Sequence, residues 1–223
     1  MLIERLSSGT KVIDDFLNGG IERGVITNFY GPPGSGKTNL SLLFTLSSLK
    51  NGDVAYIDTE NGFSTERFFQ IGGKKEDLKK ILYENPTNFK EQIKTIQKLR
   101  NLNVKLIVVD SIVSLYRLEI NKENFTEINR DLAKQLAALS FIAKDKKIPV
   151  VITNQVYSVN SDEIELSGRD IVKYWSKCLV ELKKIEDNRR LAILRKHRSL
   201  PEGRKVEFEI TNSGIEKAKF RIF

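Results

Sequence analysis

Residues 31–38 carry the pattern in this chain with the most specific chemistry. They read Gly31-Pro32-Pro33-Gly34-Ser35-Gly36-Lys37-Thr38, between an apolar run at 25–30 and a run with helical spacing from Leu40. Glycines let backbone N–H groups turn inward around a polyphosphate, and a helix that starts after such a loop directs its positive dipole end at the same anion. The pattern predicts a P-loop. The alternative is a glycine-rich turn that only joins a strand to a helix.

The P-loop mechanism predicts the ligands and the residues that bind them. Lys37 would reach the β- and γ-phosphates of ATP, and the Thr38 hydroxyl would be a ligand of Mg²⁺. The predicted nucleotide-binding residues of this segment are Gly31, Pro32, Pro33, Gly34, Ser35, Gly36, Lys37, Thr38 and Asn39.

Three further polar residues come at or just after the ends of apolar runs of strand length: Glu60, Asp110 and Gln155. In an open α/β sheet, ligands bind beyond the carboxyl ends of the strands, so we expect these side chains to lie near the P-loop. Asp110 follows four apolar residues, which is the Walker B pattern of a carboxylate that holds Mg²⁺. A Gln at this edge could bind a γ-phosphate or orient water. The alternatives are a buried strand end for Asp110 and a strand-capping residue for Gln155.

Strands and helices are predicted to alternate along most of the chain. Runs of strand length, separated by runs with helical spacing, lie at residues 25–30, 54–58, 104–110 and 148–153. This order is typical of an α/β fold with a mostly parallel central sheet and helices on both faces.

The last third of the chain has a different pattern. Two β-rich runs at 178–185 and 190–194 flank Asp187-Asn188, a turn signal, and residues 205–210 alternate. They predict a C-terminal antiparallel β-extension. Residues 157–169 are polar without a clear period and are predicted to be a loop.

Composition limits the class of protein. The 223 residues are 40% hydrophobic and carry a formal net charge of +8, which suits one domain that binds a polyanion such as nucleic acid. The alternative is a lysine-rich solvated surface. One cysteine, Cys178, excludes an internal disulfide, and one histidine makes a Cys/His zinc site implausible. With no leader and no membrane-spanning apolar run, we expect a cytoplasmic protein without membrane contact.

The order of several motifs resembles that of a known family. These motifs are Ser8-Gly9-Thr10, Gly19-Gly20-Ile21, the P-loop, Tyr56-Ile57-Asp58-Thr59-Glu60, Leu115-Tyr116-Arg117, Ile152-Thr153-Asn154-Gln155-Val156 and Leu200-Pro201-Glu202. The chain resembles the RecA-like recombinases of archaea and eukaryotes, and the match covers nearly its whole length. Residues 1–223 are therefore expected to form one RecA-like P-loop ATPase core domain. The family's N-terminal helical DNA-binding domain and polymerisation motif have no counterpart, as in a shorter archaeal paralogue of these recombinases.

The resemblance implies roles for individual residues. Glu60 matches the carboxylate that activates the attacking water, and Gln155 matches the γ-phosphate sensor that couples nucleotide state to DNA. Asp110 matches the Walker B aspartate. Arg67 resembles the arginine that stacks on adenine, a contact suited to a planar guanidinium. Residues 119–125 and 157–168 occupy the positions of two DNA-binding loops.

The second of these loops is acidic at Asp162, Glu163 and Glu165, which disfavours contact with phosphates. Basic residues elsewhere are therefore the predicted DNA contacts: Arg117, Lys122, Arg130, Arg195, Lys196 and Arg198. The last three could instead face a neighbouring subunit's nucleotide or form a solvated hairpin end.

Two functions are carried forward. The first is an ATP- and DNA-binding protein of DNA repair and homologous recombination, with weak DNA-dependent ATPase activity and no strand exchange. It would bind DNA, single-stranded by preference, modulate the main recombinase or a Holliday-junction-processing protein, and be able to form a homo-oligomer. The alternative is a regulatory ATPase of the RecA/KaiC-like class that acts on a protein partner.

Overall fold

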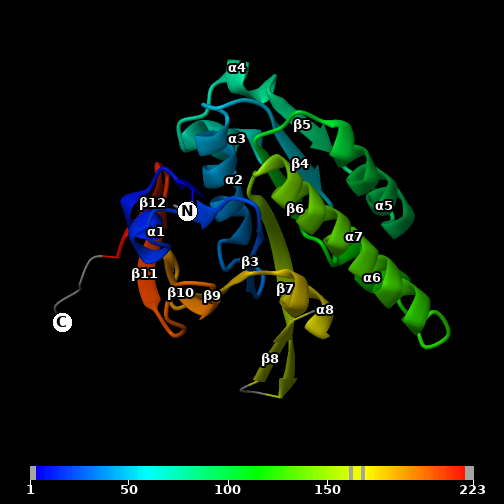
Figure 1. The fold of residues 1–223 in the computed structure, drawn as a ribbon. Coiled ribbons are helices and arrows are strands. Elements are labelled where there is room, and N and C mark those ends of the chain that lie inside the picture. The colour runs from blue at the N-terminus through cyan, green and yellow to red at the C-terminus, as the bar shows by residue number, and fades with distance from the viewer. Residues whose placement is uncertain (1–3, 161–162, 167–168, 219–223) are drawn as a thin grey trace.

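The computed structural model describes residues 4–160, 163–166 and 169–218, and they form a layered α/β structure (Figure 1). A large sheet has the strand order β12-β11-β10-β9-β3-β7-β6-β4-β5, and β8 pairs with β7 alone. The bounds of these strands are β3 (Ile26–Gly31), β4 (Val54–Asp58), β5 (Ile81–Glu84), β6 (Leu106–Asp110), β7 (Val150–Asn160), β8 (Glu163–Leu166), β9 (Cys178–Lys184), β10 (Arg189–Lys196), β11 (Lys205–Thr211) and β12 (Gly214–Lys217).

The strands from β9 to β5 are all parallel, and β9 to β12 form an antiparallel extension, so both predictions about the sheet are confirmed. A separate two-stranded sheet pairs β1 (Arg5–Leu6) with β2 (Ile21–Glu22).

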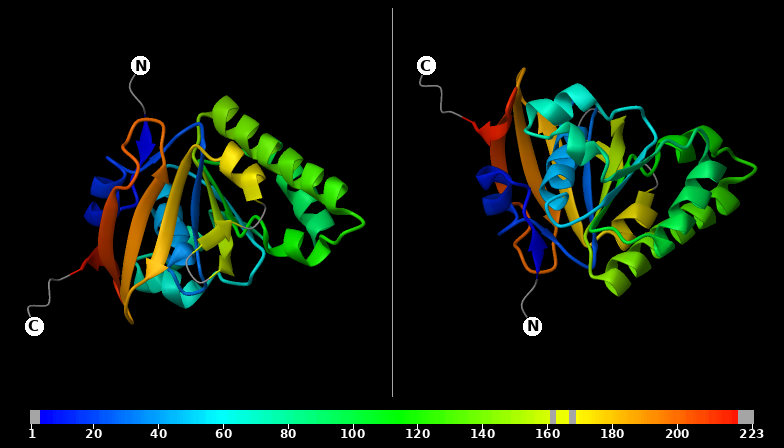
Figure 2. Two further views of the ribbon diagram at one scale, coloured as in Figure 1. Left: turned by 90° about the horizontal axis from the view of Figure 1, so that it is seen from below. Right: turned by 90° about the horizontal axis from the view of Figure 1, so that it is seen from above.

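Helices cover both faces of the sheet, on opposite sides in the views of Figure 2. One face is covered by α1 (Lys11–Phe16), α2 (Lys37–Ser48), α3 (Thr65–Gln70) and α4 (Lys75–Leu78). The other is covered by α5 (Phe89–Lys98), the short 3₁₀ turn η1 (Leu99–Asn101), α6 (Ser114–Glu119), α7 (Phe125–Lys146) and α8 (Arg169–Trp175). Among the described helices, none is long and apolar enough to cross a membrane.

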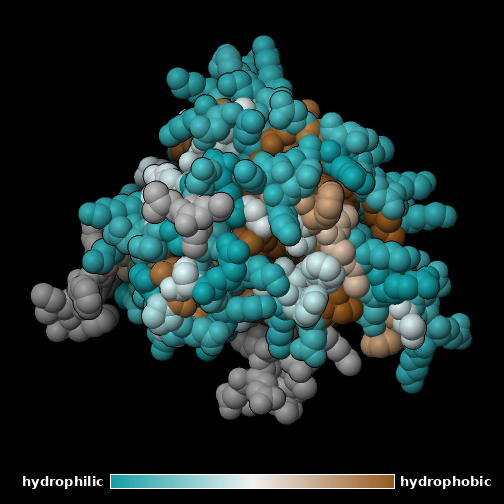
Figure 3. Space-filling view, viewed as in Figure 1, coloured by the Kyte–Doolittle hydropathy of each residue, from teal (hydrophilic) through white to brown (hydrophobic). Residues whose placement is uncertain are grey.

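The central strands read as continuous apolar runs because both of their faces are buried. In β6, Leu106 and Val108 pack into the core under α2, whereas Ile107 and Val109 pack into the core under α5 and α7. The face seen in Figure 3 is mostly hydrophilic, with hydrophobic side chains showing over α5 and α7. On α7, Phe141 is 52% exposed and has the Arg100 guanidinium 5.2 Å from its ring centre.

The prediction of a loop at 157–169 is wrong for most of that segment. Strand β7 continues to Asn160 and pairs antiparallel with β8, and α8 begins at Arg169. In this hairpin Val156 lies opposite Leu166 and Tyr157 lies opposite Glu165, and the pairing begins just beyond the part of β7 that is held in the main sheet. Asp162 and Gly168 lie outside the described residues.

Candidate nucleotide-binding site

The predicted site residues meet at one edge of the sheet because neighbouring parallel strands end there. In the β3–β7 register, Gly31 at the start of the P-loop lies opposite Gln155. In the β4–β6 register, Asp58 lies opposite Asp110. Since β3, β7, β6 and β4 are consecutive in the sheet, the P-loop, Gln155, Asp110 and the segment after Asp58 form one continuous edge.

The P-loop joins β3 to α2 and encloses the side chain of Lys37. The Lys37 ammonium donates hydrogen bonds to the carbonyl oxygens of Gly31 (2.9 Å) and Pro32 (3.0 Å) and is almost fully buried. Burial lowers its pKa, and the nearby charges of Glu60 and Asp110 partly oppose this shift. Gly34 (φ 71°) and Gly36 (φ 99°) adopt left-handed conformations that other residues rarely reach, so the loop path requires glycine at both positions.

Oxygen atoms suited to Mg²⁺ meet beside the loop. Asp110 is 3% exposed, and its carboxylate accepts hydrogen bonds from the hydroxyls of Tyr56 (3.1 Å), Thr153 and Thr38. Burial raises the pKa of Asp110, which these hydrogen bonds partly offset. In the described part of the chain no cluster of three or more His, Cys, Asp or Glu could hold a metal ion. The Asp110 carboxylate and the Thr38 hydroxyl are oxygen donors of the kind that fit a magnesium ion whose other ligands are phosphates and water.

Glu60, in the turn after β4, and Gln155, within β7, belong to one hydrogen-bonded chain. Oε1 of Glu60 accepts hydrogen bonds from the Ser111 hydroxyl (2.7 Å) and from Nε2 of Gln155 (2.8 Å). Oε1 of Gln155 in turn accepts one from the Arg117 guanidinium (2.9 Å). Arg117 comes from α6, whereas Gln155 lies on the strand that continues into the β7–β8 hairpin. Gln155 is thus connected to both segments expected to be DNA-binding loops, to 119–125 through Arg117 and α6 and to 157–168 through its own strand.

Two residues near Glu60 were not predicted from the sequence. Asp58 is buried at the end of β4, and its carboxylate accepts hydrogen bonds from the backbone N–H groups of the turn that follows. Tyr83, on β5, donates its hydroxyl proton to the same carboxylate (3.1 Å). Asp58 could have been suspected from its position at a strand end, but the hydroxyl of Tyr83 meets it only through the parallel pairing of β4 and β5.

Arg67 and Asn39 lie together beside the P-loop. The Arg67 side chain donates hydrogen bonds to Oδ1 of Asn39 (2.7 Å) and to the carbonyl oxygens of Thr211 (2.8 Å) and Asn212 (3.1 Å). An open cavity of about 540 Å³ is lined by these residues and by Asn188, Glu209 and Ile210. The cavity lies next to the start of α2.

Arg190 also contacts the P-loop, and the sequence did not predict this. Its Nε donates to the carbonyl oxygen of Gly34 (2.9 Å), and its Nη1 donates to the carbonyls of Glu186 and Asp187. Burial lowers its pKa, which the charge of Asp187 partly opposes. The P-loop is thus bonded to the turn between β9 and β10, and no pattern near residue 190 signals this.

Apart from Arg117, which is bonded to Gln155, the predicted DNA contacts fall into two groups. Arg195 is bonded to the buried Glu181 (2.6 Å), and Arg198 is bonded to the buried Glu22 (2.6 Å). These pairs support a structural role for both arginines. Lys196 donates to the carbonyl of Lys173 (2.7 Å). The exposed Lys122 and Arg130 lie before and within α7, next to the turn after α6.

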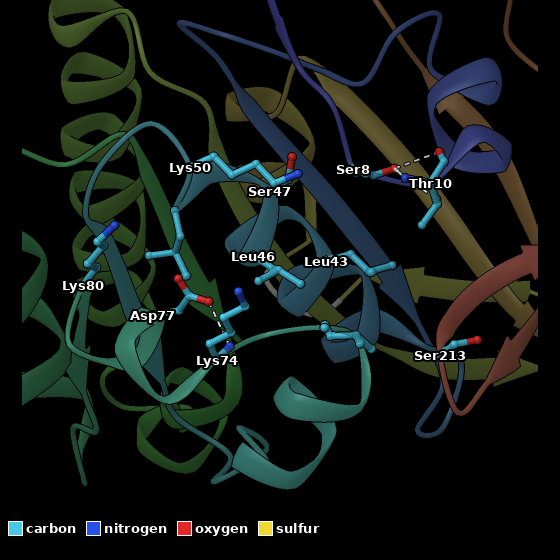
Figure 4. Close-up of a pocket in the computed structure, with 14 residues that line it drawn as sticks. Ser8, Thr10, Leu43, Leu46, Ser47, Lys50, Lys74, Asp77, Lys80 and Ser213 are labelled. Carbon is cyan, nitrogen blue, oxygen red and sulfur yellow. Dashed lines mark hydrogen bonds between the residues drawn. The ribbon is translucent and has the colours of Figure 1, made fainter.

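A second cavity, of about 520 Å³, lies at the other end of α2 from the P-loop (Figure 4). It is lined by Leu43, Leu46 and Lys50 of the α2 region, by Lys74 and by Ser213. Ser213 belongs to the same turn as Asn212, so the β11–β12 turn separates this cavity from the one beside Arg67.

Comparison with known proteins agrees with this geometry. The Rad51 family model matches residues 2–218. The chain belongs to the Rad51 family. This confirms the resemblance drawn from its motifs, and the parallel sheet with its C-terminal extension is the RecA-like fold of that family.

Individual members of the Rad51 family show how much of the chain is shared. "DNA repair and recombination protein RadB" of Methanocaldococcus jannaschii is 44% identical over 213 residues, which cover 92% of this chain and 99% of that protein. The protein of the same name from Methanococcus maripaludis strain C7 is 43% identical over 211 residues, covering 92% and 97%. A solved structure described as "Crystal structure of the RadB recombinase" superposes with a TM-score of 0.83 at 37% identity and covers 96% of this chain and all of that one.

Proposed function

We propose that this protein binds ATP with Mg²⁺ and DNA, hydrolyses ATP weakly, and acts in DNA repair and homologous recombination. One observation carries the proposal. Glu60, Asp110 and Gln155 lie along the same edge of the sheet as the P-loop, and Glu60 is hydrogen-bonded directly to Gln155. The RadB relatives, which are named for DNA repair and recombination, support the cellular role.

The chain's own residues divide the work of hydrolysis between them. The P-loop backbone and Lys37 would hold the phosphates, Thr38 and Asp110 would hold the metal, and Asn39 and Arg67 would flank the base. When bound, Mg²⁺ neutralises charge on the phosphates. Glu60 would accept a proton from the attacking water, and the hydroxyl of Ser111 and the amide of Gln155 hold its carboxylate in place for that step.

Gln155 supports a coupling between nucleotide and DNA. It contacts Glu60 on one side and Arg117 on the other, and it precedes the β7–β8 hairpin in the same strand. A change in the position of Glu60 would therefore be transmitted to the segments on either side, 119–125 and 157–168. Lys122 and Arg130, near the first segment, are the basic residues that we assign to DNA.

The partners and organisation belong to the same proposal. We assign residues 1–223 to one ATPase core that works in the cytoplasm, binds single-stranded DNA by preference and modulates a recombinase or a Holliday-junction-processing protein. Self-association is compatible with it. The acidic residues of β8, Glu163 and Glu165, support modulation rather than strand exchange, because they disfavour DNA phosphates at the second segment.

DNA affinity measured against salt concentration tests the proposal. Phosphate contacts predict a linear fall of log affinity with log salt, with a slope of about −0.7 for each contact on single-stranded DNA. ATP turnover should rise when that DNA is added. Absence of DNA binding at low salt, together with nucleotide-dependent binding to a protein partner, would replace the proposal by the regulatory ATPase.

A further inference from the structure

We propose that Asp58 and Tyr83 are positioning residues that hold Glu60 in place for the activation of water. The inference rests on the proposed function, because it gives both side chains a part in ATP hydrolysis. The feature that carries it is a buried carboxylate whose oxygens bind the backbone of the turn that presents Glu60.

The Asp58 carboxylate binds three backbone N–H groups of this turn. Its side chain is 1% exposed, its Oδ1 accepts hydrogen bonds from the N–H groups of Glu60 (3.1 Å) and Gly62 (3.1 Å), and its Oδ2 accepts one from the N–H of Phe63 (2.8 Å). Asn61 has a positive φ of 55°, which is uncommon for a residue with a Cβ. Such a turn persists where neighbouring hydrogen bonds over-determine it, and Asp58 supplies them.

The backbone position of Glu60 decides what its side chain can reach. Thr59 is fixed to β6, because its hydroxyl donates to the carbonyl of Ser111 (2.8 Å) and accepts from the N–H of Ser111 (2.9 Å). One residue later, Glu60 must place a single oxygen within reach of both Ser111 and Gln155. The bond from the Glu60 N–H to Asp58 fixes the backbone from which this side chain extends.

Tyr83 supplies the fourth hydrogen bond to Asp58. It lies on β5, the last strand of the sheet on this side, and donates its hydroxyl proton to Oδ2 (3.1 Å). Its ring stacks on Tyr56 with centres 6.4 Å apart, and Tyr56 donates to Asp110. Burial and the charge of Asp58 raise the pKa of Tyr83 to about 12, so the hydroxyl remains a donor at neutral pH. Two tyrosines thus orient the carboxylates at the ends of β4 and β6.

Tyr83→Phe is the sharpest test, because it removes one oxygen atom and keeps the stacked ring. We expect kcat for ATP to fall roughly 10-fold while the affinity for ATP stays within about twofold, since misplacement of a reacting group affects the rate and not the binding of phosphate. Asp58→Asn removes the negative charge to which the N–H groups of the turn are bonded, so it should lower kcat more than Tyr83→Phe does. Asp14→Asn is the matched control, because Asp14 also accepts a backbone N–H, that of Ser8 (2.7 Å), in a turn outside this site.

A second measurement separates positioning from a general loss of structure. If Tyr83 acts through Glu60, then Tyr83→Phe should lower kcat in the wild-type background but not in the Glu60→Gln background. Thermal unfolding of each variant confirms that it is folded. Unchanged kcat in folded Tyr83→Phe, or equal losses in both backgrounds, would overturn the inference and leave the proposed function intact. Unchanged kcat in Glu60→Gln would overturn both.

Discussion

Nε2 of Gln155 donates a hydrogen bond of 2.8 Å to Oε1 of Glu60, although the two residues lie 95 positions apart in the chain. Gln155 lies within β7, where that strand stops pairing with β3, and Glu60 lies in the turn after β4, with β6 between the two strands in the sheet. The bond joins the residue proposed as the base to the residue proposed as the phosphate sensor. The site therefore responds as a unit, and substitutions at these two positions should not have independent effects on turnover.

Lys37→Ala should weaken ATP binding by roughly 100-fold, because a buried ammonium that can bind two phosphates is lost. A fluorescent ATP analogue measures the affinity directly. Lys98→Ala, at an exposed position on α5, is the control and should bind like the wild type. Undiminished affinity in Lys37→Ala would remove the P-loop assignment.

Glu60→Gln should keep the affinity for ATP and lower kcat by about 100-fold or more, the contribution typical of a general base. The amide preserves the size of the side chain but cannot accept the proton. Steady-state phosphate release measures kcat, and Glu76→Gln, an exposed residue on α4, serves as the control. Equal turnover in Glu60→Gln would move the base to another residue.

Arg67→Ala should weaken binding of ATP without weakening binding of inorganic tripolyphosphate. The arginine lies in the cavity beside the P-loop, where it would contact the base and not the phosphates. Calorimetric titration with both ligands gives the comparison within one protein. A parallel loss for both ligands would show that Arg67 acts by holding the loop, through Asn39 and the β11–β12 turn, and not by stacking on a base.

Charge reversal at Lys122 and Arg130 should weaken binding of single-stranded DNA and make the salt dependence less steep by about 0.7 for each phosphate that the protein no longer neutralises. Lys75→Glu with Lys79→Glu, both exposed, is the matched control for net charge. Wild-type DNA affinity in the doubly reversed protein would contradict the assignment of Lys122 and Arg130 to DNA.

Arg198→Ala should leave DNA binding unchanged and lower the free energy of unfolding by about 2 kcal/mol, because Glu22 loses its closest cation.

The only histidine predicts a pH dependence of stability. The side chain of His197 is 2% exposed, and its Nδ1 accepts hydrogen bonds from the N–H groups of Ser199 and Leu200, so the folded protein favours the neutral ring. Burial lowers its pKa, Glu22 opposes this shift, and Arg5, Arg198 and Arg204 add to it.

Because the unfolded chain then binds a proton more readily, the free energy of unfolding is highest above the ordinary histidine pKa of about 6.5 and falls as the pH drops below it. The loss is about 1.4 kcal/mol for each unit by which the pKa is lowered. Urea unfolding between pH 5.5 and 8 measures it. His197→Gln should remove the slope in this range, and an unchanged slope would assign it to another group.

Much of this arrangement follows from the sequence, and the exceptions have physical causes. The strands that carry the site are predictable, because burial on both faces leaves long apolar runs such as 106–109. The short β5 has one buried residue in four, so no period marks it. Lys37 is predictable from the P-loop pattern, and Glu60, Asp110 and Gln155 are predictable from their places at or just after the ends of apolar runs. Arg190 is not, because its partner Gly34 meets it only in the finished sheet.

The hydrogen bond from Arg190 to Gly34 joins residues 156 positions apart in the chain, so it can form only after most of the protein has been synthesised. The P-loop is translated early, but its supporting guanidinium arrives with β10, when most of the chain already exists. The β11–β12 turn, whose carbonyls bind Arg67, arrives later still. A ribosome-bound chain that ends before β10 therefore contains every residue of the P-loop but lacks the hydrogen bond from Arg190 that joins the loop to the end of the sheet.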